Sequence, residues 1–169
     1  MILKKTMTTM SEMNLTTRTD SVRIEETALI EKASSAITVL TMLDGTEEKL
    51  EGKAENLLDL FCKKNGSSLK GRIDAAKYLV QAKTKFPVLI RERDYLIFFP
   101  LMGYETSQRN HWVNDSALVM ITGIGREETE LLFHTGLRLV IPYDIRMVRR
   151  QRELCERYRN ALSGIVERN

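Results

Sequence analysis

The stretch from residue 86 to residue 141 most limits the folds open to this chain. It contains five short apolar runs that are typical of strands: 86–91, 95–100, 117–122, 130–134 and 137–141. Tight turn signals join two neighbouring pairs, at 92–94 and at Thr135-Gly136. Strands joined by such short turns are antiparallel. The stretch therefore predicts a mostly antiparallel sheet, and Pro142 ends its last strand because proline cannot donate to a ladder.

Helical periodicity occurs on both sides of that stretch. Between 54 and 64 an apolar stripe recurs at helical spacing, and Asn65-Gly66 predicts its end. A second helix follows a cap at Ser67 or Ser68, and Asp144 can cap a C-terminal helix of about twenty residues. The sequence therefore predicts an α+β fold with two early helices, a mostly antiparallel sheet and one closing helix.

The remaining segments are predicted from their local composition. Two earlier runs read as strands, and the second stops at the turn signal Asp44-Gly45: 23–31 and 36–42. Three polar or glycine-containing segments are predicted to be connectors or loops: 47–53, 101–111 and 123–125.

One domain accounts for most of the 169 residues. Residues 1–22 are rich in threonine and methionine without an apolar period, which predicts a disordered or loosely attached tail before a single domain at 23–169. The longest apolar run, 95–102, is far shorter than the roughly 20 residues of a membrane span, and no signal-peptide pattern is present, so we expect a cytoplasmic protein.

The two cysteines occupy apolar positions of helical patterns and are expected to be buried free thiols: Cys62 and Cys155. No spacing of Cys and His suits zinc, and Gly123-Ile124-Gly125 lacks a dinucleotide fingerprint. We therefore expect neither a metal nor a cofactor.

The charge is unevenly distributed along the chain. Residues 1–60 hold 7 Lys and Arg against 11 Asp and Glu, whereas residues 61–169 hold 19 against 12. Between 63 and 91 there are eight cations and one anion, Asp74. A localised surplus indicates an anionic partner such as nucleic acid, although a solvated basic face explains the charge equally well.

The segment Gly66–Arg72 combines two glycines, two hydroxyls and two cations directly before a helix. Phosphate oxygens could accept from the N–H groups of this helix start and from four side chains: Ser67, Ser68, Lys70 and Arg72. A capping and packing role is the alternative. Gly71 costs about 1 kcal/mol relative to alanine in a helix, which we explain by close approach of the strand at 95–100.

The polar loop before Trp112 is a second candidate for DNA contact. It offers donors of the kind that probe a minor groove: Arg109, Asn110 and His111. Trp112 is expected to anchor the core and not to stack on a base. The arginine face of the last helix could bind DNA, contact a second protomer or remain solvated.

Catalytic chemistry has little support in the sequence. A nucleophile needs a base within hydrogen-bond reach, and the histidines are His111 and His134. A hydrolase that uses Ser68 and His111 is a distant alternative, so we expect no enzyme activity.

Several motifs follow one another in a recognisable order: Gly66-Ser-Ser-x-x-Gly-Arg72, Lys85-Phe-Pro-Val-Leu-Ile90, Leu96-Ile-Phe-Phe-Pro100, Trp112-Val-Asn114, Tyr143 and Arg152. Over the span 57–155 the chain thereby resembles the competence transcription factor family (ComK) of Gram-positive bacteria. The first 22 residues lie outside the resemblance.

The resemblance implies a transcription activator that acts in the cytoplasm at the nucleoid. Such proteins bind A/T-rich promoter boxes as oligomers of dimers, mainly through the minor groove, and switch on genes for DNA uptake. An adaptor-and-protease system controls their level. The alternative is a regulatory protein-binding module on the same fold that has lost DNA binding.

We therefore predict a set of DNA-binding residues from both lines of reasoning: Ser67, Ser68, Lys70, Arg72, Lys77, Arg109, Asn110, His111, Asn114 and Arg149.

Overall fold

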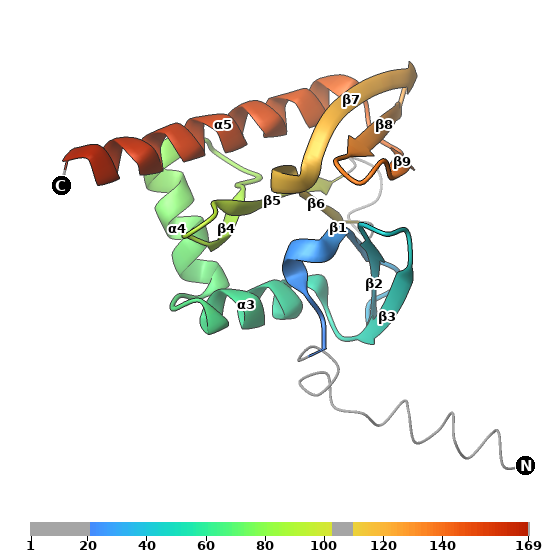
Figure 1. The fold of residues 1–169 in the computed structure, drawn as a ribbon, viewed down its shortest axis with the longest axis horizontal. Helices are drawn as coiled ribbons and strands as arrows, with labels where there is room; N and C mark the ends of the chain where they lie inside the picture. Colours follow the sequence, from blue (N-terminus) through green and yellow to red (C-terminus); the bar gives the residue numbers. More distant parts are fainter. Residues whose placement is uncertain (1–20, 103–109, 169) are drawn as a thin grey trace, which may run out of the picture.

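The structure is a computed structural model that describes residues 21–102 and 110–168. In this part of the chain, six strands form one antiparallel sheet in the order β3-β2-β1-β6-β5-β4 (Figure 1). Their bounds are Thr27–Lys32 (β1), Ile37–Met42 (β2), Glu47–Glu51 (β3), Val88–Arg91 (β4), Leu96–Met102 (β5) and Asn110–Asn114 (β6).

A second, antiparallel sheet of three strands follows within the described residues, in the order β7-β8-β9. Its strands are Leu118–Gly125 (β7), Glu128–Phe133 (β8) and Arg138–Ile141 (β9). The helices are Ala54–Lys64 (α3), Leu69–Val80 (α4) and Ile145–Arg168 (α5), with short 3₁₀ turns at Ile24–Glu26 (η1) and Asp115–Ala117 (η2). The predicted α+β fold, with two early helices and a closing helix, is confirmed.

The six-stranded sheet lies between two apolar layers. On one side α3 packs against it, with Phe98 of β5 and Trp112 of β6 in the same buried cluster. On the other side α5 and the second sheet pack against it, and Phe99 belongs to that cluster. Figure 1 shows α3 and α5 on opposite sides of the sheet. Successive residues of β5 therefore serve opposite faces, as the period of a strand requires, and Trp112 is a core anchor as predicted.

Local turn and cap chemistry matches the expectations. Asp44 Oδ1 accepts hydrogen bonds from Thr46 N–H and Oγ1–H at 2.8 and 2.6 Å, and Gly45 has φ +91°. Gly136 has φ +90° in the turn between β8 and β9. Glycine tolerates this left-handed conformation without a steric penalty, so both hairpins turn where the sequence predicts.

The prediction of a connector at 47–53 is wrong, because residues 47–51 form β3. Its register with β2 runs from Thr41↔Glu47 to Ile37↔Glu51, and Leu50 is its one buried residue. Backbone pairing needs no apolar side chains on a sheet edge, and charged residues are common there. For this reason the strand could not be predicted from its composition alone.

Two further segments differ from their predictions. Met102 and Asn110 pair across β5 and β6, so both ends of the predicted loop 101–111 are strand; residues 103–109 lie outside the described residues. Gly123 and Gly125 belong to β7, which carries bulges that accommodate them. The strand predicted at 23–31 begins later, after η1.

Most of the predicted tail, residues 1–20, lies outside the described residues. Val22 is described, and it is buried in the cluster on the α3 side. Both cysteines are buried, and burial raises the pKa of the Cys62 thiol to about 11. Among the described residues, no helix has the length and apolar character needed to cross a membrane.

Candidate nucleic-acid interface

The segment Gly66–Arg72 starts α4, and Ser68 caps it as predicted. Ser68 Oγ accepts a hydrogen bond from Gly71 N–H at 3.0 Å. Asp59 Oδ1, from α3, accepts one from Leu69 N–H at 2.9 Å. A carboxylate and a hydroxyl thus already accept from the N–H groups that a phosphate would use. The geometry favours the capping role for this segment.

Gly71 is explained by the cap and not by the sheet. A Cβ atom there would lie 3.1 Å from Ser67 Oγ and 3.2 Å from Ser68 Oγ, and no strand atom lies within 4 Å of it. The proposed close approach to the strand at 95–100 is therefore wrong. Glycine leaves room for the two hydroxyls beside the first turn.

Arg72 points into the protein, with a side chain only 10% exposed. Its Nη1 donates to Glu92 Oε1 at 3.0 Å, and its Nη2 donates to the carbonyl of Asn65 at 3.4 Å. A guanidinium held in this way connects α4 to the turn between β4 and β5. The geometry therefore gives Arg72 a structural role, and these contacts compete with the predicted contact to phosphate.

His111 is also buried, although it was predicted to act from a loop. It lies in β6, where Nδ1 is 2.6 Å from Tyr143 Oη and Nε2 is 3.4 Å from Glu31 Oε1. Tyr143 in turn donates to the carbonyl of Leu101 at 3.2 Å. These contacts join β6, β1 and the segment before α5, so His111 serves packing in this structure.

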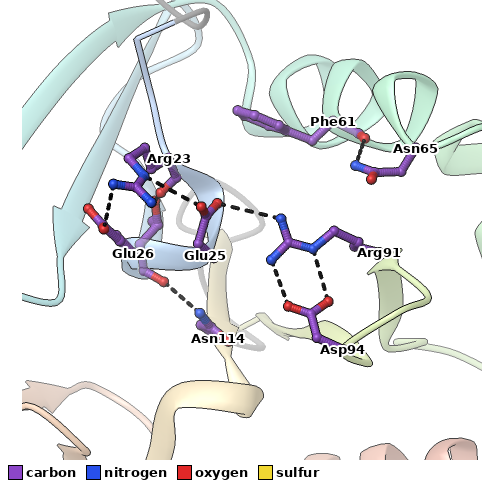
Figure 2. A network of polar contacts seen from close by, with 9 residues as sticks. Arg23, Glu25, Glu26, Phe61, Asn65, Arg91, Asp94 and Asn114 are labelled. Carbon is purple, nitrogen blue, oxygen red and sulfur yellow. Dashed lines mark hydrogen bonds and ion pairs between the residues drawn. The ribbon is translucent and has the colours of Figure 1, made fainter.

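Asn114 belongs to a polar network that closes one end of the sheet (Figure 2). Its Nδ2 donates to the carbonyl of Thr27 at 3.0 Å, and its Oδ1 accepts from Ala117 N–H at 3.3 Å. Nearby, Arg91 donates to both carboxylate oxygens of Asp94, at 2.9 and 2.6 Å. Asn114 is fully buried, so its amide is not available to a base edge.

Of the other residues predicted around Trp112, Asn110 is half-buried at the start of β6. Arg109 lies outside the described residues, and its role stays a prediction.

Asp115 anchors α5 to the point where the chain leaves the first sheet. Its carboxylate is 3% exposed and accepts from Arg152 Nε at 3.2 Å and from Arg159 Nη1. Arg152 also donates to the carbonyl of Leu118. Both arginines are therefore committed to holding the fold.

Arg149 is exposed on α5. It lines an open hollow between β7 and α5, next to two carboxylates: Glu153 and Glu156.

Besides Arg149, five exposed cations in or just after the helices have no ion-pair partner in the described part of the chain. We call them the α4–α5 cation set: Lys70, Lys77 and Lys83 in and just after α4, and Arg150 and Arg157 in α5. The two helices pack together through a shared buried cluster that includes Ala76 and Tyr158. Lys77 Nζ lies 5.5 Å from the Phe86 ring centroid, a cation–π contact that does not neutralise its charge.

The sequence analysis placed Lys70 and Lys77 in the predicted DNA-binding set and gave the arginine face of the last helix, with Arg150 and Arg157, as a possible DNA contact; only Lys83 was not considered. Arg150 and Arg157 are seven residues apart, which is nearly two helical turns, so they share one face of α5. That spacing was visible in the sequence. What the sequence did not show is which arginines of α5 are already paired.

The arrangement offers no support for hydrolysis. Ser68 caps α4, whereas His111 bonds Tyr143 and Glu31 inside β6, so neither is the other's partner. Among residues 21–102 and 110–168, no three metal-ligating side chains come together.

Comparison with known proteins identifies the chain by its family. Searches of curated proteins and of solved structures found no match. The family model described as "ComK protein" matches residues 1–164 of the 169. The match includes the first 22 residues, which lay outside the resemblance drawn from individual motifs. The chain therefore belongs to the ComK family of competence transcription factors.

Proposed function

We propose that this protein is a transcription activator that binds A/T-rich promoter DNA mainly through the minor groove and controls genes for DNA uptake. The α4–α5 cation set carries the DNA-binding part of the proposal, because it presents five exposed, unpaired cations on two adjacent helices. Family membership supports the transcriptional part.

The cation set would contact the phosphate backbone and fix the orientation of the protein on DNA. Such contacts carry no sequence information, and they make affinity strongly dependent on salt. If all five cations displace counterions, the slope of log affinity against log salt should be about −4.5 per protomer. Ser67 and Ser68 lie at the start of α4 and could donate to a phosphate next to Lys70.

Base reading would fall to Arg109 and Asn110. Narrow A/T-rich minor grooves are strongly negative and attract inserted arginine side chains. His111 and Asn114 would have to break buried hydrogen bonds to take part, so we leave them out. We also leave out Arg72, which is held by Glu92.

The wider biology follows from the family resemblance. We propose that the protein acts at the nucleoid in the cytoplasm, that dimers assemble on paired A/T-rich boxes, and that an adaptor-and-protease system sets its level.

A salt series of gel shifts tests DNA binding directly. We expect the wild type to prefer an A/T-rich over a G/C-rich duplex at every salt concentration. Two double variants remove pairs of these cations: Lys70→Ala/Lys77→Ala and Arg150→Ala/Arg157→Ala. Each should weaken binding to both duplexes equally and reduce the slope of log affinity against log salt by about 0.9 per cation removed. Lys49→Ala, on the charged edge strand β3, is the matched control and should leave binding unchanged.

Arg109→Ala separates base reading from phosphate contact. This substitution should reduce the difference in affinity between the A/T-rich and G/C-rich duplexes more than it changes the slope of log affinity against log salt. Absence of binding to the A/T-rich duplex even at low salt would overturn the proposal and favour the regulatory protein-binding module.

A further inference from the structure

The end of β5 and the start of β6 depend on side chains for part of their support. β4 pairs with β5 only as far as Phe98, so in the described residues the segment 99–102 has a strand partner on one side only. At its end, Met102 pairs with Asn110 of β6. Asn110 is one of the two residues to which we assign base reading. The contacts that hold this pair of residues therefore also fix the place of Asn110.

Tyr143 holds both strands with one hydroxyl group. Its side chain is buried, and its Oη donates to the carbonyl of Leu101 at 3.2 Å. The same oxygen lies 2.6 Å from His111 Nδ1, and the two rings meet edge to face with their centroids 5.2 Å apart. Leu101 and His111 are direct partners across β5 and β6. The phenol therefore joins the two strands one residue pair before Met102 and Asn110.

The position of Tyr143 is fixed in turn by two other elements. Its carbonyl accepts a hydrogen bond from Thr129 Oγ1 of β8 at 2.7 Å. Two residues later Ile145 begins α5, and Asp144 Oδ1 caps that helix by accepting from Arg146 N–H at 2.8 Å. Tyr143 therefore ties the ends of β5 and β6 to the second sheet and to the start of α5.

Lys85 holds the next carbonyl of β5. Its Nζ donates to the carbonyl of Met102 at 3.3 Å, and its own carbonyl accepts from Nε2 of the buried Gln151 of α5 at 3.1 Å. Lys85 has φ +57°, in the left-handed region that residues with a Cβ seldom adopt. Such strain persists only where the surrounding contacts fix it, and it is common at functional sites. The contacts of Lys85 with α5 and β5 are of that kind.

Two separate side chains thus connect adjacent carbonyls of β5 to one helix. Tyr143 lies directly before the cap of α5, and Lys85 is bonded to Gln151 within it. Gln151 follows Arg150, a member of the α4–α5 cation set. Both links therefore join the end of the sheet that carries Asn110 to the helix that carries Arg150.

We propose that Tyr143 and Lys85 are positioning residues for DNA recognition. They hold the end of the β5–β6 ladder, and with it Asn110, at a fixed place relative to α5. When the cations of α5 bind phosphates, Asn110 then meets the base edges in one register. Groups that recognise a ligand need such support to within about 0.5 Å, and a bonded, buried polar network supplies it. Neither Tyr143 nor Lys85 has to touch DNA in this role.

This inference rests on the proposed function for one point, the assignment of base reading to Asn110. Its test therefore has one part without DNA and one part with DNA, so that a failure of either proposal can be told from a failure of the other.

Amide hydrogen exchange, measured by NMR, tests whether the two side chains hold the strands. Tyr143→Phe keeps the buried ring and removes only the bonding hydroxyl. Lys85→Met keeps most of the aliphatic stem and removes the ammonium group. Each should raise the exchange rates at 101–102 and 110–111 about fivefold or more, because local opening then costs less, and should leave the rate of Leu40 in β2 unchanged.

Two further variants are matched controls. Tyr158→Phe removes the hydroxyl of another buried tyrosine, on α5, which forms no hydrogen bond with β5 or β6 in the described part of the chain. It should leave exchange at the strand ends unchanged. Lys85→Arg keeps a cationic donor and should preserve most of the wild-type protection. Rescue by arginine but not by methionine assigns the effect to the donated hydrogen bond and not to packing of the stem.

Gel shifts across a salt series test the role in recognition. Tyr143→Phe and Lys85→Met should reduce the preference for the A/T-rich over the G/C-rich duplex about threefold to tenfold, because Asn110 is no longer held in register. The slope of log affinity against log salt should remain that of wild type, because no phosphate contact is removed. A loss of folded protein weakens binding to both duplexes equally and leaves the preference unchanged. Tyr158→Phe should alter neither quantity.

The proposal is wrong if exchange at the strand ends stays at the wild-type rate in both variants, or if exchange rises while a wild-type preference between the duplexes persists. A slope reduced by about 0.9 in Lys85→Met would make Lys85 a phosphate contact and not a positioning residue. The two variants act on different carbonyls, so either one decides the outcome if the other does not fold.

If wild type binds neither duplex, the proposed function fails and the recognition role fails with it. The exchange rates then still show whether Tyr143 and Lys85 hold the two strands. If wild type prefers the A/T-rich duplex and the variants lose only that preference, both proposals are supported.

Discussion

The two sheets of this protein use similar apolar residues for different purposes. In β5, six of the seven residues are buried, whereas in β7 only one of the eight is buried. β5 lies inside the six-stranded sheet with apolar layers on both faces, and β7 lies at an edge with one face on the core. An apolar strand is therefore buried or exposed according to its position in the sheet and not its composition.

The same contrast holds for charged residues. Arg72 and Asp115 are buried at the margins of the first sheet and hold its neighbouring helices. Arg138 and Glu130 pair on the second sheet, where the Arg138 side chain is 57% exposed. The first sheet thus lies between two buried layers, whereas the second sheet contributes Leu131, Phe133 and Ile141 to the core and leaves most of β7 exposed. The following predictions compare matched positions in the two.

The largest difference is expected between Phe98 and Met120. Phe98→Ala removes a fully buried ring from β5 and should lower the free energy of unfolding by about 3–5 kcal/mol. Met120→Ala, at an exposed residue of β7, should lower it by less than about 1 kcal/mol. Urea unfolding at a protein concentration that keeps both variants monomeric measures the two. Equal losses would show that the second sheet is as much a part of the core as the first.

The second-largest loss in the free energy of unfolding is expected for Asp115. Asp115→Ala leaves two arginines without their shared, buried carboxylate and should cost about 3 kcal/mol. The control Glu128→Ala removes an exposed carboxylate from β8 and should cost less than about 0.5 kcal/mol. A loss below 1 kcal/mol for Asp115→Ala would contradict an anchoring role for this residue.

Arg72 and Arg138 provide a smaller contrast. Arg72→Ala removes a buried guanidinium with two acceptors and should cost about 1–3 kcal/mol. Arg138→Ala breaks an exposed pair and should cost at most about 1 kcal/mol. DNA affinity per folded molecule should be unchanged by Arg72→Ala. If that variant folds normally but binds all DNA weakly, the phosphate role predicted from the sequence is restored.

The smallest effect concerns Asp144, which joins β9 to α5. The Arg146 side chain and backbone N–H donate to its carboxylate and lower its pKa to about 2. Since the folded-state pKa lies below the usual value, the contribution is present above about pH 4 and is lost as the pH falls through about 2. The difference in Tm between wild type and Asp144→Asn should therefore shrink over that range. Glu127→Gln, an exposed change near the same sheet, should show no such trend.

The elements that depend on neighbouring residues were predictable. Apolar spacing between 54 and 64 predicted α3, Ser68 capped α4 as expected, the turn signal Asp44-Gly45 predicted the end of β2, and Thr135-Gly136 predicted the β8–β9 hairpin. In each case residues that are close in the sequence determine the backbone conformation.

The candidate site was predicted less well, because it depends on which polar groups meet across the chain. Asn114 forms a hydrogen bond with Thr27, and His111 forms one with Tyr143. No local sequence pattern predicts these contacts. Arg72 has the same chemistry as a phosphate-binding residue until Glu92 is placed beside it. The edge strand β3 was missed for a similar reason, since its partner and not its composition makes it a strand.

The sequence by itself determined the α+β class, the helices and hairpins, and the surplus of cations after residue 60, because these follow from composition and from contacts between near neighbours. The tertiary structure alone decided which cations are already paired, which apolar strand is left at an edge, and where β7 and α5 share one hollow. Pairing and burial are properties of residues that are distant in the chain, and they become defined only when the sheets and helices pack.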